Sequence, residues 1–253
     1  MKDQVIVITG ASSGIGLALA EIAVARGARV VVAARRTAEL EAVATRLGAH
    51  AVTTDVTKRD QIDRLRDQAI AKHGHIDVWV ANAGRGITRS VLQLTDDDLD
   101  DMIATNVKSV VYGMQSVVPH FRDRKRGHHI TVSSMLARIP FATVRSAYSA
   151  AKAAVTSLST SLRMEITEAD VHISTVFPGI VATEFGSNAL HGGFDSRKLP
   201  NAQPVEEAAG VIADLIERPR AEIYTRPDGR DVIARYFAAD DVSVIERQMQ
   251  FPR

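Results

Sequence analysis

The chain of 253 residues is 45% hydrophobic and 24% charged, and its 31 basic and 30 acidic side chains leave a net charge of +1, so we expect no binding to nucleic acid or to a membrane. The absence of cysteine excludes disulfides, zinc–thiolate sites and thiol nucleophiles. The apolar runs fall short of the ~20 residues of a membrane span, and residues 1–8 have too short an apolar core for a signal peptide, which predicts a soluble, cytoplasmic protein.

Short apolar runs alternate with segments of helical periodicity. The apolar runs are residues 4–9, 28–34, 50–55, 76–81, 128–134, 171–177 and 221–225. Apolar residues at helical spacing cover 15–26, 37–47, 58–73, 96 to about 124, 146 to about 168, and 204–216. Continuous apolar strands joined by helices are typical of a parallel sheet covered on both faces. We therefore predict one doubly wound α/β domain over residues 1–253, with a seven-stranded parallel sheet and helices on both faces.

Residues 184–203 are long for a loop inside a compact domain, and such loops usually carry function. We expect this segment to be a substrate loop. His191 lies within it and invites a catalytic or metal-binding interpretation, but it has no partner at ligand spacing. We therefore predict a mobile-loop residue and no metal site.

A glycine-rich turn, TGASSGIG, follows the first strand directly and opens a helix. Gly10, Gly14 and Gly16 would let the backbone approach a pyrophosphate, and the helix N-terminus offers free N–H groups to it. The spacing differs from the usual G-x-G-x-x-G, and glycines in such a turn can also serve only to form a tight turn, without binding a ligand. Its position between the first strand and the first helix favours a dinucleotide site.

Strand two ends in AARRT, which places Arg35 and Arg36 where many dinucleotide-binding folds carry an acidic residue. A carboxylate would repel a ribose 2′-phosphate, whereas a guanidinium can bind it through two hydrogen bonds. The alternative is a solvated pair at a helix start. We predict that the chain prefers NADP(H) to NAD(H).

Tyr148 and Lys152 in the stretch SAYSAAK are spaced to share one helix face. A nearby cation favours the phenolate and lowers a tyrosine pKa from ~10 toward neutrality. This spacing is also common by accident and is often structural. Ser133 and Ser134 favour a catalytic role for Tyr148 and Lys152, because the two serines end the fifth strand at the carboxyl edge of the sheet, where ligands bind.

Together these motifs resemble the short-chain dehydrogenase/reductase family. The resemblance covers about residues 4–185. The motifs that carry it are TGASSGIG, ANAG (81–84), Asn106, the Ser133–Ser134 pair, YSAAK (148–152) and PGIVAT (178–183). It implies a Rossmann-type fold of the branch of about 250 residues, which interconverts ketones or aldehydes and alcohols with NADP(H).

The resemblance assigns catalytic roles to four residues. Tyr148 would be the general acid in reduction and the base in oxidation. Lys152 would lower the pKa of Tyr148 and hold the nicotinamide ribose. Ser134 would hydrogen-bond the carbonyl oxygen, and Asn106 would kink its helix and hold a water that relays protons to Lys152.

The resemblance also implies a cofactor site. Asp55 would contact the adenine, and Ile180 and Thr183 would contact the nicotinamide carboxamide. The full set is Gly10, Ser12, Ser13, Gly14, Ile15, Gly16, Arg35, Arg36, Asp55, Val56, Asn82, Ala83, Gly84, Tyr148, Lys152, Pro178, Gly179, Ile180 and Thr183.

Three departures from the family pattern stand out. Ser134 lies one residue farther from Tyr148 than expected, so Ser133 could take its place, although we favour Ser134. Ala81 replaces the first asparagine of the family's NNAG, which affects a sheet contact more than chemistry. A tail over about 230–253 replaces the usual glycine-rich ending. It puts the usual tetramer interface in doubt, although the family implies a homodimer or homotetramer.

The positions that line the substrate pocket in the family are largely apolar here. They are Arg85, Met135, Leu136, Phe141 and Phe185. An apolar carbonyl compound is therefore the expected substrate. Arg85, Arg138 and Arg145 could meet an acidic substrate, but loop arginines are more often solvated.

Two alternatives stay open. An epimerase or dehydratase of the extended branch uses the same Tyr-x-x-x-Lys pair, but the glycine spacing and the lack of a large C-terminal substrate domain argue against it. A non-catalytic NADP-binding sensor or scaffold would typically lose the tyrosine, lysine or serine, and all three are present here.

Overall fold

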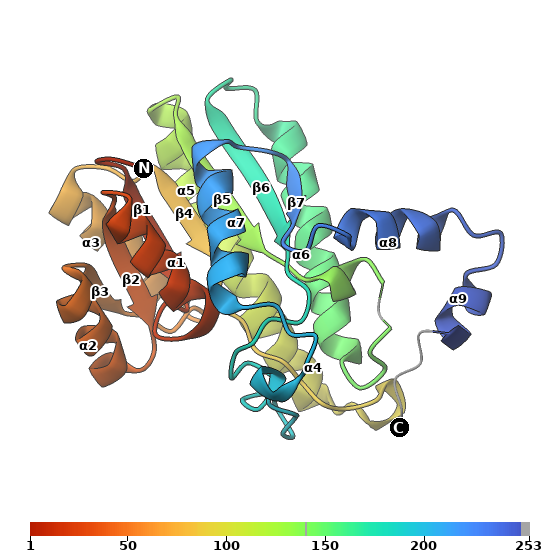
Figure 1. Ribbon diagram of the computed structural model, residues 1–253. Coiled ribbons are helices and arrows are strands. Elements are labelled where there is room, and N and C mark those ends of the chain that lie inside the picture. Colours follow the sequence, from red (N-terminus) through yellow and green to blue (C-terminus); the bar gives the residue numbers. More distant parts are fainter. Residues whose placement is uncertain (140, 249–253) are drawn as a thin grey trace.

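The computed structural model describes residues 1–139 and 141–248. Seven parallel strands form one sheet in the order β3-β2-β1-β4-β5-β6-β7, which confirms the predicted sheet (Figure 1). The strands are β1 Val5–Thr9, β2 Arg29–Ala34, β3 His50–Thr53, β4 Val78–Ala81, β5 Gly127–Val132, β6 Val171–Phe177 and β7 Glu222–Tyr224.

Helices cover both faces of the sheet. They are α1 Gly14–Ala25, α2 Thr37–Leu47, α3 Arg59–His73, α4 Asp96–Ile103, α5 Ser109–Asp123, α6 Ser146–Glu165, α7 Val205–Glu217, α8 Gly229–Phe237 and α9 Val242–Gln248. Because successive strand residues point to opposite faces, Ile6 and Ile8 pack with α1, α2 and α7, whereas Val7 packs with α3, α5 and α6. Both faces of the strands are therefore buried, which explains their continuous apolar runs.

The long helix predicted from residue 96 to about 124 is interrupted. A capping box between Thr95 and Asp98 begins α4, and a π-helical turn, Ala104–Lys108, separates α4 from α5. The turn contains Asn106, which is fully buried. Hydrophobic periodicity does not reveal one widened turn, because the apolar stripe continues on both sides of it.

The strand order reverses at β1, which lies between β2 and β4. In open parallel sheets such a reversal opens a crevice outside the carboxyl ends of the strands. The glycine turn after β1 and the ANAG turn after β4 therefore meet at this crevice.

The predicted tail forms two helices, α8 and α9, which extend beyond β7 in Figure 1. Tyr236 of α8 donates a hydrogen bond to Glu246 of α9 at 2.6 Å, and Ile233 packs with Met135 and Phe177. The last part of the predicted tail, residues 249–253, lies outside the described residues. No helix in the described part of the chain is long and apolar enough to cross a membrane.

Candidate active site

The predicted site residues follow the carboxyl ends of six neighbouring strands. The glycine turn follows β1, and the Arg35–Arg36 pair follows β2. The remaining segments are Asp55–Val56 after β3, Asn82–Gly84 after β4, Ser134 after β5, and Pro178–Thr183 after β6. Tyr148 and Lys152 join this edge from the first two turns of α6.

The glycine turn is held against the ANAG turn by side-chain hydrogen bonds. The amide of Asn82 donates to the carbonyls of Thr9 at 2.9 Å and Gly10 at 3.2 Å. The hydroxyl of Thr9 accepts hydrogen bonds from the backbone N–H groups of Asn82 and Ala83, both at 3.1 Å. Thr9 had not been predicted as a site residue, although it precedes Gly10 in the same motif.

Gly10 and Gly16 leave the backbone no room for a side chain. Gly10 has a φ of +67°, and a Cβ there would lie 2.8 Å from Cα of Ala83. A Cβ on Gly16 would lie 2.5 Å from the Gly10 carbonyl oxygen and 2.6 Å from the Asn82 amide nitrogen. The bare backbone of this turn fits the close approach of a dinucleotide pyrophosphate.

Replacing Gly16 by alanine is expected to weaken the binding of an NAD(P)-type dinucleotide at least about tenfold and to destabilise the fold by ~1–3 kcal/mol, because the methyl group must displace backbone. Gly210→Ala is the matched control, since nothing lies within 4 Å of a Cβ at that position in α7. Titration with NADPH and NADH and thermal unfolding of both variants check the prediction. Equal behaviour of the two variants would contradict it.

The Gly14 turn also meets the segment after β6. Gly14 has a φ of +58°, and a Cβ there would lie 3.4 Å from the methyl group of Thr183. Thr183 therefore lies across the glycine turn. The predicted pyrophosphate and nicotinamide contacts are thus neighbours in space although they are far apart in the sequence.

The end of β2 carries exposed positive charge beside the glycine turn. Arg36 donates a hydrogen bond to the hydroxyl of Ser12 at 3.2 Å and pairs with Glu39 at 3.5 Å. Asp55 accepts hydrogen bonds from Thr57, which hold its pKa below the ordinary value against the opposing effect of burial, and the nearby Arg35 adds to this. Arg35 and Arg36 thus flank the predicted adenosine side.

Tyr148 is only 8% exposed, and its hydroxyl is hydrogen-bonded to Ser134. Burial raises the pKa of Tyr148 to about 12, although the hydrogen bond with Ser134 and the charge of Arg145 act in the opposite direction. The ring lies 5.5 Å from that of Phe185, measured between centroids. Tyr148 is therefore protonated at neutral pH in this structure.

The two serines face different partners. The hydroxyl of Ser133 donates to the Lys152 carbonyl at 3.1 Å and lies 2.8 Å from the hydroxyl of Thr156, so it is engaged by the α6 backbone. Ser134 contacts Tyr148, and its hydroxyl also accepts from the N–H of Leu136 at 3.1 Å. A short 3-10 turn, Met135–Ala137, follows Ser134 and accommodates the one additional residue between Ser134 and Tyr148. The two side chains therefore still meet.

Lys152 is buried beside Tyr148. Its ammonium donates to the Val132 carbonyl at 2.8 Å and lies 5.7 Å from the centroid of the Tyr148 ring. Burial lowers the pKa of Lys152 to about 8. Burial raises the pKa of Tyr148, and the charge that opposes this effect is that of Arg145, so a lowering of this pKa by Lys152 stays a prediction.

Asn106 fixes the backbone at the start of the substrate side. Its amide donates to the Arg85 carbonyl at 3.0 Å and accepts from the Arg85 N–H at 3.1 Å. A Cβ on Gly84 would lie 2.9 Å from the amide oxygen of Asn106 and 3.4 Å from the ammonium of Lys152. The structure thus brings Asn106, Gly84 and Lys152 together.

The five predicted substrate residues fall into three groups. Leu136 packs in the apolar cluster that contains Tyr148, and the ring of Phe185 lies against Tyr148. Arg85 lies at the margin and pairs with Asp101 at 3.7 Å. In contrast, Met135 and Phe141 belong to the cluster covered by α8 and α9.

His191, predicted to be a mobile-loop residue, contacts two charged side chains of the fold. Its Nε2 lies 2.6 Å from a carboxylate oxygen of Asp98, and Arg89 binds the other oxygen at 2.8 Å. The hydrogen bond from His191 holds the pKa of Asp98 well below its usual range. The described residues contain no cluster of three or more potential metal ligands.

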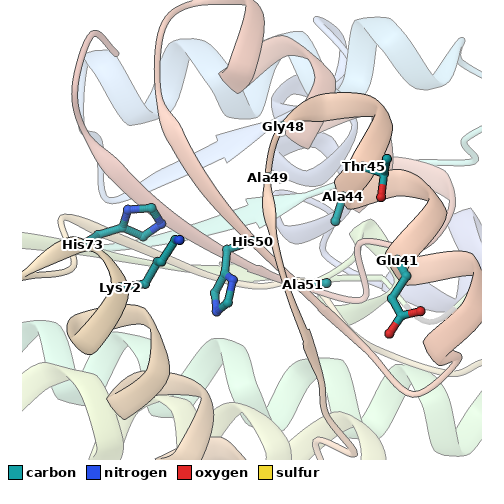
Figure 2. Close-up of a pocket in the computed structure, with 9 residues that line it drawn as sticks. All are labelled: Glu41, Ala44, Thr45, Gly48, Ala49, His50, Ala51, Lys72 and His73. Carbon is teal, nitrogen blue, oxygen red and sulfur yellow. The ribbon is translucent and has the colours of Figure 1, made fainter.

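A shallow surface pocket lies away from this site. Figure 2 shows its lining, with His50, Lys72 and His73 on one side and Glu41 on the other. The pocket lies between the C-terminal ends of α2 and α3 and the amino end of β3. It is therefore at the opposite edge of the sheet from Tyr148.

Comparison with known proteins gives consistent matches. The family model described as short chain dehydrogenase matches residues 4–192. An uncharacterized oxidoreductase of Listeria monocytogenes is 38% identical over 232 residues, which cover 87% of this chain and 92% of that protein. An alcohol dehydrogenase from the archaeon Thermococcus sibiricus, solved with 5-hydroxy-NADP, is 25% identical, with a TM-score of 0.78 over 88% of this chain and 96% of that one. The closed form of a serine dehydrogenase with NADP+ is also 25% identical, with a TM-score of 0.82 over 87% and 94% of the two chains.

Proposed function

Because the chain belongs to the short-chain dehydrogenase family, we propose that it is an NADP(H)-dependent oxidoreductase that interconverts a ketone or aldehyde and an alcohol. The observation that carries the proposal is the buried contact of Tyr148 with Ser134 beside Lys152, next to a glycine turn without room for side chains. This arrangement joins a proton donor to a dinucleotide cradle. It supports redox chemistry at a carbonyl carbon.

Each residue of the site has a separate role in the reduction of a carbonyl group. Bound NADPH supplies the hydride. Tyr148, which is protonated at neutral pH, donates the phenol proton to the carbonyl oxygen. The hydroxyl of Ser134 lies beside the phenol and stabilises the charge that develops on the same oxygen. Lys152 remains largely charged at neutral pH and would hold the ribose hydroxyls.

The preference for NADP(H) rests on Arg35 and Arg36. Both are exposed at the end of β2, and Arg36 reaches the glycine turn through Ser12. Guanidinium groups at this point can bind a ribose 2′-phosphate. The alcohol and serine dehydrogenases named above were solved with NADP-type cofactors, whereas a 3-ketoacyl-(acyl-carrier-protein) reductase from Brucella melitensis, also 25% identical, was solved with NADH. The proposed preference therefore rests on the two arginines and not on these neighbours.

Replacing Arg35 by alanine is expected to weaken NADPH binding roughly tenfold or more and to leave NADH binding unchanged, because a charge-assisted contact with the 2′-phosphate is lost. Arg46→Ala is the control, since Arg46 of α2 pairs with Glu21 at 2.6 Å. Fluorescence titration with both cofactors measures the two affinities. An unchanged preference for NADPH would refute the role of Arg35.

The proposed activity is tested by mixing the wild-type protein with NADPH and a panel of ketones and aldehydes. Loss of NADPH absorbance that depends on the carbonyl compound is the expected result. Tight binding of NADPH without turnover of any compound would favour a non-catalytic sensor instead.

A further inference from the structure

The arginines around the site differ in their partners. Three of them pair with carboxylates: Arg85 with Asp101 at 3.7 Å, Arg89 with Asp98 at 2.8 Å, and Arg138 with Glu222 at 2.5 Å. Arg145 has no carboxylate within 4.0 Å in the described part of the chain. In this respect it differs from Arg85, Arg89 and Arg138, whose charges are neutralised by carboxylates.

Arg145 is also buried, with only 8% of its surface exposed. Its Nη1 donates to the Ile87 carbonyl at 3.2 Å, and its guanidinium carbon lies 5.7 Å from the centroid of the Phe194 ring. Neither contact supplies a negative charge. A buried cation without a counter-charge is costly, so an anion that reaches Arg145 from outside the chain would be strongly favoured.

The position of Arg145 places this charge beside the reacting groups. Arg145 is the N-cap residue of α6, and the first turn of that helix contains Tyr148 and no acidic side chain. The helix N-terminus adds positive potential at the same point. A Cβ on Gly86 would lie 2.9 Å from Nη1 of Arg145 and 3.2 Å from the ring of Phe185, and the centroid of that ring lies 5.5 Å from that of Tyr148. An anion bound by Arg145 would therefore lie a few bonds from a carbonyl group held at Tyr148.

We propose that Arg145 binds a carboxylate of the substrate, so that the site takes a small oxo acid or hydroxy acid. The proposal rests on the oxidoreductase function proposed above. The planar guanidinium matches the two oxygens of a carboxylate, and an ammonium does not reproduce that geometry. Leu136 and Phe185 then provide apolar contacts for the carbon chain.

Arg145 also touches the substrate loop, and a purely structural role must be told apart from recognition. A Cβ on Gly86 would lie 2.9 Å from its Nη1, and a Cβ on Gly193 would lie 3.1 Å from its Nη2. If Arg145 only held this loop, its loss would affect acidic and neutral substrates alike. The ratio of kcat/KM for an acidic substrate to kcat/KM for a neutral one therefore distinguishes the two roles.

The experiment measures kcat/KM with NADPH for acetoacetate and for its neutral analogue, methyl acetoacetate. The wild type is expected to prefer the acid, and Arg145→Met is expected to lower kcat/KM for the acid about 100-fold while changing that for the ester by less than about threefold. Arg138→Met is the matched control, because Glu222 already neutralises Arg138, and it should keep the wild-type ratio. An equal loss for both compounds in Arg145→Met would overturn the proposal.

A binding measurement makes the test independent of turnover. Calorimetric titration of the protein loaded with NADP+ should show that 3-hydroxybutyrate binds more tightly than its methyl ester, and that Arg145→Met removes the difference. Unchanged NADP+ affinity of the variant shows that it is folded. If neutral ketones are reduced and acids are not favoured in either assay, the proposal fails while the oxidoreductase function stands. If no carbonyl compound is reduced at all, the proposed function fails, and the titration alone decides on Arg145.

Discussion

Tyr148→Phe is expected to lower kcat about 1,000-fold and to leave the affinity for NADPH nearly unchanged. A positioned general acid contributes roughly 100- to 10,000-fold to rate, and phenylalanine keeps the ring contact with Phe185 while removing the proton. The loss should appear in kcat more than in KM, because the proton is needed in the transition state and not for binding. Steady-state kinetics with NADPH and the best carbonyl substrate measure the effect.

Tyr112→Phe is the matched control for this prediction. Tyr112 lies on α5 under the guanidinium of Arg59, 4.3 Å from the ring centroid, and takes no part in the site. Its phenylalanine variant should retain wild-type kinetics. Full activity of Tyr148→Phe would refute Tyr148 as the acid.

A steep loss of stability below about pH 6.5 is the second large effect expected. His128 and His129 of β5 are buried, and burial lowers the pKa of each to about 3. Both ring nitrogens of His129 are buried and lack a hydrogen-bond partner among the described residues. Histidine in an unfolded chain has a pKa of about 6.5. Between these two values the unfolded state binds protons that the folded state does not.

The sign follows from this difference in proton binding. The free energy of unfolding should fall with decreasing pH by about 1.4 kcal/mol per pH unit for each histidine, and by about 2.7 kcal/mol per unit for both, between about pH 6.5 and 3. Above pH 6.5 both states hold neutral imidazoles and the contribution is constant. Urea unfolding at a series of pH values measures the slope.

His129→Leu separates this effect from other titrations. The leucine places an apolar side chain between Trp79 of β4 and Ile173 of β6, the strand partners of His129, and removes one of the two buried imidazoles. The slope of the free energy of unfolding against pH between about 6 and 4 should decrease by about 1.4 kcal/mol per pH unit, which is the contribution of one imidazole. The same slope in the variant and in the wild type would contradict the assignment.

The sheet and most helices could be predicted from the sequence because local pattern decides them. Strands with both faces buried are continuous apolar runs, and their helices keep a clear apolar stripe. The π-helical turn at Asn106 and the helices α8 and α9 could not be predicted in this way. The π-helical turn is a local change of hydrogen bonding that leaves the hydrophobic pattern unchanged. The two helices depend on packing against Met135 and Phe177, which are distant in the sequence.

The site shows the same division. The glycine turn and the residues after each strand could be placed, because parallel strands bring their carboxyl ends to one edge. The contact of His191 with Asp98 could not, because 93 residues separate the two in the sequence. The lack of a carboxylate partner for Arg145 could not be predicted either, because it depends on the positions of all the side chains around the guanidinium.

Deuteride transfer tests the central claim most directly. The wild-type protein is given NADPH that carries deuterium at the transferable position of the nicotinamide, together with a carbonyl substrate, and the alcohol product is analysed by mass spectrometry. The account predicts an alcohol with one deuterium on the former carbonyl carbon, formed by the wild type and almost absent with Tyr148→Phe. An alcohol without deuterium, or no alcohol from any carbonyl compound despite tight NADPH binding, would contradict it.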